Sequence, residues 1–539
     1  MPRKKSKKQE AAASTETVVV ETAQAPPTDP LPADSATADP APVVTETVVV
    51  TEIVSDPEPL PPASMPVAND DDSRIPLVVD VDGTLITSDI LAESYRMFLL
   101  HKPTQALVAL TTLSDRAAFK KKIADSVDLD MQKLPFNPQV MALVAKAKAD
   151  GRKVYLASAS DRKYVEALAE ALQLFDGVFA SDGALNLKAE AKARVLCEAF
   201  GEKGFDYVGD GVGDFAVWQK SREVIVVGTS AYVAREAKLR FPHARILGKP
   251  IGIADYARAL RVHQWSKNLL IFVPTVMAHL LTWAHLLPAI IAFFSFSFCA
   301  SSVYLLNDWF DLDDDREHPV KQHRMLASGG LSLLKGTELI IITLLASVGL
   351  ALTLPEEFLM VLAVYYALTF AYSLWLKHLV LVDVITLASL YGIRLISGAS
   401  FGVELSEWLV AFSFFLFLSL ALLKRYAELA ARAAEGRNAP AGRGYEARDT
   451  SAIFSMATAS AYIAVLVMAL YIQNPLVTKL YASPQWLWGC CIILIYWVSH
   501  LLLLTARGKM NEDPVIFVMT DSTSLVCGGL MGMVLWASI

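Results

Sequence analysis

Residues Asn307 to Gly329 read NDWFDLDDDREHPVKQHRMLASG and follow the apolar run Leu286 to Leu306, which is long enough to cross a bilayer. If a helix continues past Leu306, Asp308, Asp311 and Asp315 share one face, with Asn307 beside them. Carboxylates gathered in this way repel one another unless a divalent cation neutralises them. Oxygen ligands of this kind suit Mg²⁺ that also binds a substrate's phosphates.

Basic residues follow these carboxylates within one or two helical turns. Lys321 and Arg324 supply cations of the type that binds phosphate oxygens. We therefore predict a site for a charged, Mg²⁺-bridged ligand at a membrane face. The alternative is a solvated acidic loop that ends a transmembrane helix.

The composition predicts three regions of different character. The chain has 539 residues, of which 54% are hydrophobic, and its mean hydropathy is +0.40, too apolar for a wholly soluble protein. We expect a disordered tail over residues 1–72, an α/β domain over 73–250 and an all-α membrane domain over 251–539. The five cysteines have no metal-binding spacing and indicate small core residues in a reducing compartment. No nucleic-acid partner is expected.

The tail is rich in Pro, Ala, Thr and acidic residues and contains TETVVV twice, so it has little to bury. Its opening MPRKKSKK has no apolar run behind it and is not a signal peptide.

Short apolar runs alternate with helical stretches between residues 73 and 250, which predicts βαβ units and a parallel sheet. The expected strands are Ile75–Val79, Val154–Ala157, Phe205–Val208 and Val224–Val227, and the clearest helices are Asn137–Asp150 and Asp161–Leu172. Ligands of such sheets bind beyond the carboxyl ends of the strands.

Acidic residues stand at those ends. Asp80 and Asp82 lie two apart on an extended segment, so both side chains point the same way. One can attack a phosphorus atom while the other transfers the proton, with Mg²⁺ neutralising the cluster. DVDGTL, Ser158, a following lysine and GDGVGD resemble the four motifs of the haloacid-dehalogenase-like (HAD) phosphatases. The resemblance implies that Asp80 is the nucleophile, Asp82 the acid/base and Ser158 a phosphoryl ligand. It also implies that Asp210 and Asp214 complete a metal site to which Asp80 and Asp82 belong.

The lysine of this family is either Lys188 or Lys192. We favour Lys192 because it opens the helix Lys192–Phe200 and has the family's KxxxL spacing. A HAD fold kept only as a scaffold is the alternative to an active phosphatase. The residues between Asp82 and Ser158 are expected to form a small helical cap over the site.

The rest of the chain contains nine apolar runs close to the length of a membrane span. They cover residues 266–283, 286–306, 337–354, 357–376, 379–401, 407–424, 453–473, 485–505 and 515–537. The loops after the even-numbered runs hold thirteen of the fourteen loop cations. The positive-inside rule then places these loops and the α/β domain in the cytoplasm and the C-terminus outside an inner (cytoplasmic) membrane.

Several charged groups in this half need another explanation. Lys267 and Asn268 stand at the start of the first run, and Arg394 follows Asp383 by eleven residues, ~16 Å along a helix and on the same face. An arginine at that depth is costly unless it meets a cavity or a partner. It either binds an anion or forms a structural ion pair.

Residues 255–539 resemble the UbiA-type prenyltransferase superfamily, and within it the branch of decaprenyl-phosphate phosphoribosyltransferases. The shared segments are HQWSKNLLIFVP, the Asn307–Gly329 stretch, YSLWLKH followed by a lone aspartate, KRYAEL and RGKMNEDPV. The branch usually has Arg-Pro where this chain has Arg261-Val262 and Arg324-Met325. The resemblance implies a helical bundle around a cavity that opens to the cytoplasm.

That branch transfers phosphoribosyl from phosphoribosyl diphosphate (PRPP) to a polyprenyl phosphate. This region has one acidic cluster, and the single aspartate Asp383 stands in place of a second acidic cluster. Such a set suits the binding of one Mg²⁺-diphosphate together with another phosphate group. We expect Asp308, Asp311 and Asp315 to be catalytic metal ligands. The expected phosphate-binding or substrate-binding residues are Lys267, Asn268, Asn307, Lys321, Arg324, Lys377, Arg394, Lys424 and Arg425.

The HAD domain is then expected to remove the 5-phosphate of the product. One alternative is an aromatic prenyltransferase that uses an isoprenyl diphosphate. Another is a nonenzymatic scaffold or transporter with a regulatory HAD domain. The lipid's length and the oligomeric state are left open.

Overall fold

The computed structural model describes residues 74–112, 114–182, 186–228, 230–434, 444–510 and 514–539. The described residues belong to one compact unit, Ala68–Ile539. The predicted disordered tail, residues 1–72, lies outside the described residues.

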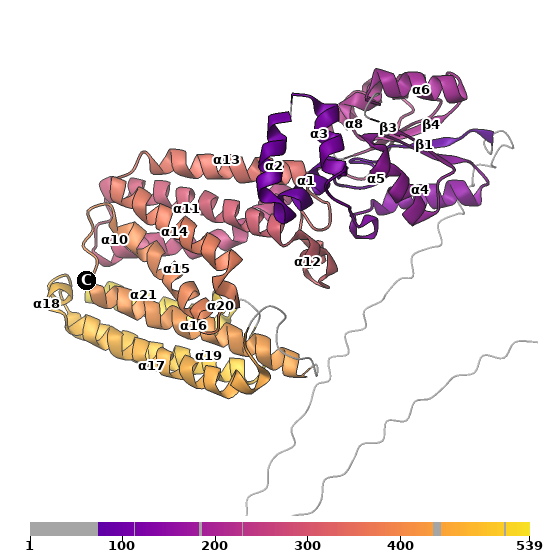
Figure 1. Cartoon of the computed structure of the whole chain (residues 1–539). Helices are drawn as coiled ribbons and strands as arrows, with labels where there is room; N and C mark the ends of the chain where they lie inside the picture. Colours follow the sequence, from indigo (N-terminus) through magenta and orange to yellow (C-terminus); the bar gives the residue numbers. More distant parts are fainter. Residues whose placement is uncertain (1–73, 113, 183–185, 229, 435–443, 511–513) are drawn as a thin grey trace, which may run out of the picture. The chain divides into compact units, whose positions relative to one another are not determined.

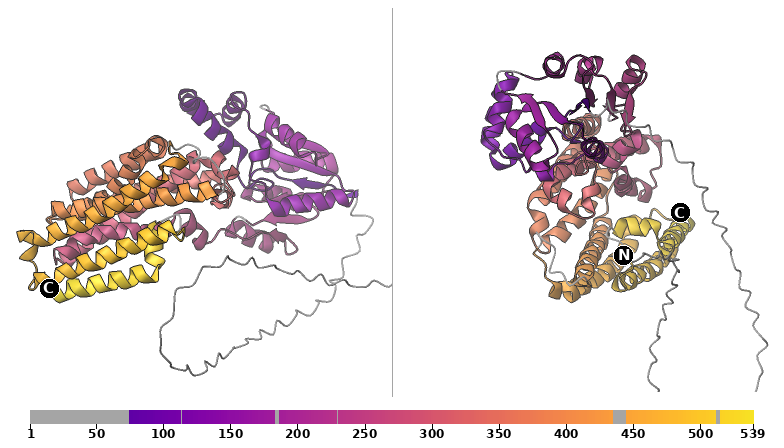
Figure 2. Two further views of the ribbon diagram at one scale, coloured as in Figure 1. Left: turned by 90° about the horizontal axis from the view of Figure 1, so that it is seen from below. Right: turned by 90° about the vertical axis from the view of Figure 1, so that its right-hand side faces the viewer.

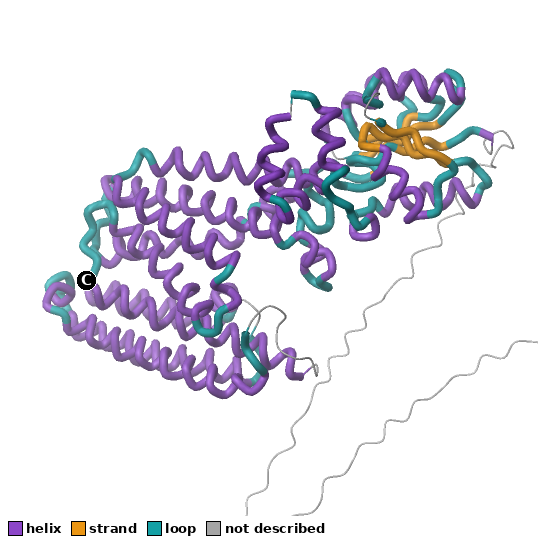
Figure 3. The backbone as a smooth tube through the Cα atoms, viewed as in Figure 1, coloured by secondary structure: helices purple, strands orange, loops and turns teal. Residues whose placement is uncertain are grey.

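The first part of the unit is built on one parallel sheet of six strands in the order β3-β2-β1-β4-β5-β6. Figure 3 shows these strands gathered in a single sheet with helices around it. The strands are β1 Leu77–Val79, β2 Val154–Asp161, β3 Gly177–Ser181, β4 Asp206–Gly209, β5 Val224–Val227 and β6 Arg245–Leu247. All four predicted strands are present, within a few residues at their ends.

Two strands escaped prediction, and both are edge strands. β3 opens with a glycine and is only half buried over its first three residues. β6 has three residues, none of which is fully buried. A strand that buries little does not need the continuous apolar run by which buried parallel strands are recognised.

The central strands are buried on both faces. Leu77 and Val79 of β1 pack with α4 and α5 on one face, while Val78 packs with α6, α7 and α8 on the other. The helices of this α/β domain are α1 Ile90–His101, α2 Pro103–Ala109, α3 Arg116–Ala124, α4 Pro138–Ala149, α5 Arg162–Leu172, α6 Glu190–Phe200, α7 Phe215–Lys220 and α8 Ala231–Arg240.

Side-chain caps explain where the two predicted helices begin. Asn137 accepts a hydrogen bond from the Gln139 backbone before α4, and Asp161 accepts one from the Lys163 backbone before α5. Helices α1, α2 and α3 lie between β1 and α4 in the chain, where a helical cap was expected.

The second part of the unit is all helical, and its long helices run side by side in a bundle (Figures 1 and 2). Its elements, with η marking 3₁₀ helices, are α9 Ile253–Ala259, η5 Val262–Phe272, α10 Val273–Met277, α11 Trp283–Phe310, α12 Leu312–Glu317, η6 Lys321–His323, α13 Leu333–Ala351, α14 Glu356–Leu374, η7 Leu376–His378, α15 Val382–Ala399, α16 Glu407–Ala434, η8 Ala447–Asp449, α17 Thr450–Gln473, α18 Pro475–Thr478, η9 Pro484–Leu487, α19 Trp488–Ala506, α20 Pro514–Thr520 and α21 Ser522–Ser538.

Seven helices of the described residues are long and apolar enough to cross a membrane, which identifies a multi-pass membrane protein. They are α11, α13, α14, α15, α16, α17 and α19. Nine full-length helices were predicted, and the first and last predicted runs account for the difference.

Each of those two runs is interrupted, the first by a residue with left-handed backbone and the second by an aspartate that caps a new helix. Residues 266–283 form most of η5 and the short α10, which ends before His279, a residue with a left-handed φ of 57°. Asp521 caps α21 through the Ser524 backbone and separates it from α20. The resulting α21 has 17 residues.

The acidic stretch does continue the helix of the preceding span, as predicted, but only to Phe310. Asp311 leaves the helical conformation and α12 starts at Leu312. The three carboxylates therefore stand on two helices and the joint between them, instead of on one continuous helical face.

Candidate functional sites

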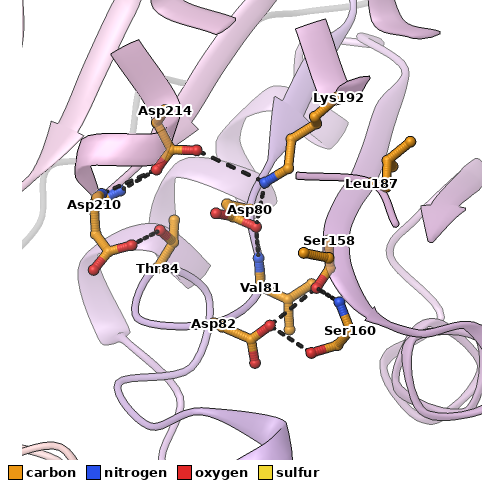
Figure 4. Close-up of polar contacts among 12 residues, drawn as sticks. Asp80, Val81, Asp82, Thr84, Ser158, Ser160, Leu187, Lys192, Asp210 and Asp214 are labelled. Carbon is orange, nitrogen blue, oxygen red and sulfur yellow. Dashed lines mark hydrogen bonds and ion pairs between the residues drawn. The ribbon is translucent and has the colours of Figure 1, made fainter. Parts of the chain in front are cut away.

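Three carboxylates meet at the carboxyl ends of β1 and β4 (Figure 4). Asp80, Asp210 and Asp214 each offer one oxygen, and these oxygens lie within 4.8 Å of one another. The sheet order reverses between these two neighbouring strands, which is where ligands of open parallel sheets bind. The donor set suits a hard divalent cation such as Mg²⁺.

Lys192 joins this cluster from α6. Its Nζ lies 2.9 Å from Asp80 Oδ1 and 3.7 Å from Asp214 Oδ1, and it also donates to the Tyr207 hydroxyl at 2.9 Å. The competing candidate, Lys188, is exposed. The geometry thus places the favoured lysine beside the predicted nucleophile.

Burial makes the charged forms of these acids unfavourable. It raises the pKa of Asp80 well above its ordinary value, against the attraction of Lys192. It also raises the pKa of Asp210 to about 7, with further repulsion from Asp214 and Asp82. A cluster that holds this much unfavourable negative charge is one that a bound cation stabilises.

Asp82 faces a different set of partners. Its Oδ2 accepts hydrogen bonds from Ser158 at 3.0 Å and from Ser160 at 2.7 Å, and its Oδ1 accepts from the Ile90 backbone at 2.8 Å. Asp82 is therefore held apart from the three-carboxylate group. Ser160 was not predicted, although it lies two residues after Ser158 on the same strand face.

The second site lies where α11 ends. One nitrogen of Arg324 binds Asp308 Oδ1 at 3.0 Å and Asp315 Oδ2 at 2.6 Å, so these two carboxylates converge on one guanidinium. Arg261 adds a second contact to Asp308 Oδ1 at 2.5 Å. The acidic pair is thus neutralised by two arginines that come from the chain on either side of α11.

Two lysines complete this charged cluster. Lys377 Nζ lies 3.4 Å from Asp311 Oδ2, and Lys321 Nζ lies 3.9 Å from Asp315 Oδ1. Asp315 Oδ1 is buried and has no hydrogen-bond partner in the structure. A buried carboxylate oxygen that lacks a hydrogen bond and lies beside basic side chains fits a site that accepts a divalent cation together with phosphate oxygens.

Arg394 is buried in the bundle among neutral groups. Its guanidinium donates to Asn268 Oδ1 at 2.8 Å, to the Leu390 carbonyl at 2.6 Å and to the Tyr365 hydroxyl at 3.0 Å. No carboxylate among the described residues lies within 4.0 Å of it, so the suggested ion pair with Asp383 is not formed. Its positive charge is balanced by no acid there, which favours the anion-binding alternative.

Asp383 instead pairs with Arg425, and both side chains are fully buried. Their contact is 2.6 Å long, the Tyr445 hydroxyl donates to Asp383 at 2.5 Å, and Glu428 also contacts Arg425. This corrects the prediction that Arg425 meets a substrate phosphate. A guanidinium with no exposed surface and two acidic partners is not available to a ligand.

The remaining predicted residues are partly buried. Lys267 lies on η5, Asn307 on α11 and Lys424 on α16. Their substrate contacts stay predictions.

Residues 270–520, most of the helical region, match the UbiA prenyltransferase family. This part of the chain is a UbiA prenyltransferase family domain. The matched region includes the acidic stretch after α11.

A protein of Sinorhizobium fredii, "Uncharacterized protein y4nM", is 35% identical over 468 residues, which cover 85% of this chain and 90% of that protein. This alignment is longer than the helical region, so it takes in α/β residues as well. The combination of an α/β domain with a UbiA region is therefore shared with a relative.

The "Decaprenyl-phosphate phosphoribosyltransferase" of Corynebacterium glutamicum is 33% identical over 187 residues, or 33% of this chain and 56% of that enzyme. Among solved structures, a UbiA homolog from Archaeoglobus fulgidus bound to GPP and Mg²⁺ is 19% identical and covers 52% of this chain and 95% of its own, with a TM-score of 0.39.

Arg261 is the main site residue of the UbiA region that sequence reasoning passed over. It was noted as a departure from a family dipeptide but was not assigned a role. Its left-handed φ of 51° at the start of η5 turns its side chain to Asp308 and over the Tyr304 ring. The sequence signal that could have identified Arg261 is its position as a cation shortly before the family segment HQWSKN.

Proposed function

We propose that the UbiA region transfers a 5-phosphoribosyl group from PRPP to a polyprenyl phosphate in the membrane. The diphosphate of PRPP leaves, and a phosphate oxygen of the lipid bonds to the anomeric carbon with inversion. We also propose that the α/β domain is a HAD-type phosphatase that removes the 5-phosphate from the product.

The contacts of Asp383 are the observation that favours PRPP over an isoprenyl diphosphate as the donor. An aromatic prenyltransferase is expected to use a second acidic cluster in this part of the chain to hold an isoprenyl diphosphate. Asp383 is fully buried, and its carboxylate forms an ion pair with Arg425 and accepts a hydrogen bond from Tyr445. This supports a single metal–diphosphate site, as a sugar diphosphate donor requires. The similarity to decaprenyl-phosphate phosphoribosyltransferases agrees with this choice.

The donor's diphosphate is assigned to the charged cluster after α11. Asp308, Asp311 and Asp315 would hold Mg²⁺, which neutralises the diphosphate and makes it a better leaving group. Arg261, Arg324 and Lys321 contact these carboxylates, and we assign them to the diphosphate oxygens. Catalysis here consists of placing the two phosphorylated substrates and stabilising charge as the leaving group departs.

The lipid phosphate is assigned to the cationic side of the bundle. Arg394 is a buried cation that has no acidic partner in the part of the chain that the structure describes, and Asn268 orients it. Lys267, Lys377 and Lys424 supply further positive charge for the lipid phosphate and for the phosphate on the ribose. The lipid chain is expected to leave between helices into the bilayer.

In the α/β domain, Asp80 is assigned as the nucleophile that takes the phosphoryl group from the ribose 5-oxygen. Asp82 protonates that oxygen and then deprotonates the water that hydrolyses the phospho-aspartate. Lys192 neutralises Asp80, and Asp210 and Asp214 complete the Mg²⁺ site. From the distribution of loop cations we infer that both sites face the cytoplasm and that the C-terminus lies outside.

Mass spectrometry of lipids from membranes that contain the full chain tests this assignment. Supplied with PRPP, Mg²⁺ and a polyprenyl phosphate, wild-type membranes should form a lipid-linked ribose without the 5-phosphate. Asp80→Asn should accumulate the form that keeps this phosphate. Dephosphorylated product from Asp80→Asn would refute the phosphatase role.

The same membranes separate the alternatives. Consumption of farnesyl diphosphate with an aromatic acceptor, and not of PRPP, would identify an aromatic prenyltransferase. Consumption of neither donor, with phosphatase activity also absent, would favour the nonenzymatic scaffold or transporter.

A further inference from the structure

Helix α1 of the α/β domain carries two charged side chains that are almost completely buried. Glu93 is 2% exposed and Arg96 is 1% exposed. Charges that lose water in this way are costly unless an opposite charge and hydrogen bonds compensate them.

Both compensating charges lie on α12, the short helix of the acidic stretch. Arg316 binds Glu93 through two nitrogens, at 2.6 and 3.3 Å. Arg96 Nη2 binds Asp313 Oδ2 at 2.5 Å, and its Nη1 donates to the Trp309 carbonyl at 3.4 Å. The α/β domain is therefore bound to the helix that carries Asp315.

The two pairs have matched spacing. Glu93 and Arg96 are three apart on α1, and Asp313 and Arg316 are three apart on α12. Residues at this spacing share a helix face, so two opposite-charge pairs form at once. Reversing or sliding one helix would bring like charges together, and the arrangement fixes one register.

The far end of the acidic stretch packs against the same domain. Gly329 has a left-handed φ of 70°, and a Cβ built on it would lie 1.6 Å from Thr87 Oγ1. Ala92 of α1 also packs on the apolar cluster that contains Leu312 and Leu326. Close packing thus supports the ion pairs on both sides of the acidic carboxylates.

Helix α12 cannot fix its own position. It has six residues, too few to be stable alone in water, and its orientation depends on what it packs against. We propose that Glu93 and Arg96 are positioning residues of the transferase: they hold α12 so that Asp315 stands ready to bind the metal–diphosphate. This rests on the proposed function of the UbiA region.

Hydrogen–deuterium exchange of the metal-free full chain in detergent tests the positioning directly. Glu93→Gln and Arg96→Met should speed amide exchange in residues 307–317, while exchange in β1 and β4 stays at wild-type rates and shows that the sheet is folded. Lys133→Met is the matched control, because Lys133 pairs with Glu317 of the same helix through exposed side chains. It should leave exchange unchanged.

A second measurement links position to function. In both variants the Mg²⁺ concentration for half-maximal transfer from PRPP should rise about tenfold, because Asp315 is then held less firmly; losses of this order follow when the groups that orient metal ligands are removed. Hydrolysis of p-nitrophenyl phosphate by the α/β domain should not change. Glu93→Arg combined with Arg316→Glu restores an opposite-charge pair and should recover most of the Mg²⁺ affinity.

The outcomes separate the two proposals. Wild-type rates of exchange in residues 307–317 of Glu93→Gln and Arg96→Met would overturn the positioning role, whatever the enzyme's substrate. Altered exchange together with a wild-type protein that does not use PRPP would support the positioning of α12 and refute the proposed donor.

Discussion

The Nζ of Lys192 lies 2.9 Å from Asp80 Oδ1, although 112 residues separate them in the chain. The contact forms because β1 and α6 converge at the carboxyl edge of the sheet. It places a buried cation on the carboxylate that we assign as a nucleophile, where it lowers the repulsion met by an incoming phosphate.

Replacing this lysine gives the first prediction. Lys192→Met should lower kcat for p-nitrophenyl phosphate hydrolysis by roughly 10²-fold or more, the usual cost of removing one charged group from a site where charge develops. Lys188→Met, which removes the exposed alternative, is the control and should keep wild-type activity. An equal loss of kcat in both variants would contradict the specific role that we assign to Lys192.

The acidic stretch gives the second prediction. Asp308→Ala and Asp311→Ala should abolish formation of lipid-linked ribose, because each removes a carboxylate that we assign to Mg²⁺. Phosphatase activity should remain. Asp314→Ala is the control, since this side chain is exposed on the same short helix and should be replaceable. Product formation by Asp308→Ala, measured by incorporation of labelled ribose, would contradict the metal-ligand assignment.

Local pattern was enough to predict the buried strands, the capped helices and the carboxylates at the strand ends. β1 and β5 are short apolar runs, and the residue that follows β1 or β4 is an aspartate. The same reasoning located Asp308 and Arg324, because residues of one charge followed by the other at a membrane-span end are a strong local signal.

Contacts between distant elements could not be predicted in this way. Arg261 and Asp308 are 47 residues apart, and their contact accompanies a left-handed backbone turn at Arg261 that a local pattern does not reveal. Arg425 looked like one cation of a phosphate site, but the fold brings it to Asp383. Pairing of buried charges depends on helix packing, which the sequence of either helix alone does not determine.

Asp206 gives a prediction about pH. Burial alone would raise the pKa of this carboxyl, but Arg222 and Arg152 outweigh burial and lower the pKa below its ordinary value. A lowered pKa means that the stabilisation is present above the ordinary aspartate range and is lost as pH falls through the folded value. Asp206→Asn should therefore lower the free energy of unfolding of the sheet by about 3 kcal/mol at pH 7, and this loss should shrink as the pH falls below the ordinary aspartate range.

Infrared spectroscopy in ¹³C-labelled urea, whose carbonyl band is shifted away from the amide I region, measures this effect. The strands of the described residues all lie in the α/β domain, so the strand amide I band reports its unfolding. Asp128→Asn is the control, since its pair with Lys163 is exposed and contributes little. A difference between Asp206→Asn and wild type that did not shrink at low pH would show that the carboxylate's charge is not the source of stability.

The Arg425–Asp383 pair gives the last prediction. Removing one partner of a fully buried pair leaves an uncompensated charge, so Arg425→Met should destabilise the bundle by roughly 3–5 kcal/mol. Asp383→Leu added to Arg425→Met removes that charge, and the double variant should unfold at a higher temperature than Arg425→Met. Thermal unfolding in detergent measures the coupling. If Arg425→Met instead kept the wild-type midpoint and raised KM for PRPP, Arg425 would be a substrate ligand, and the buried pair would have to open when the donor binds.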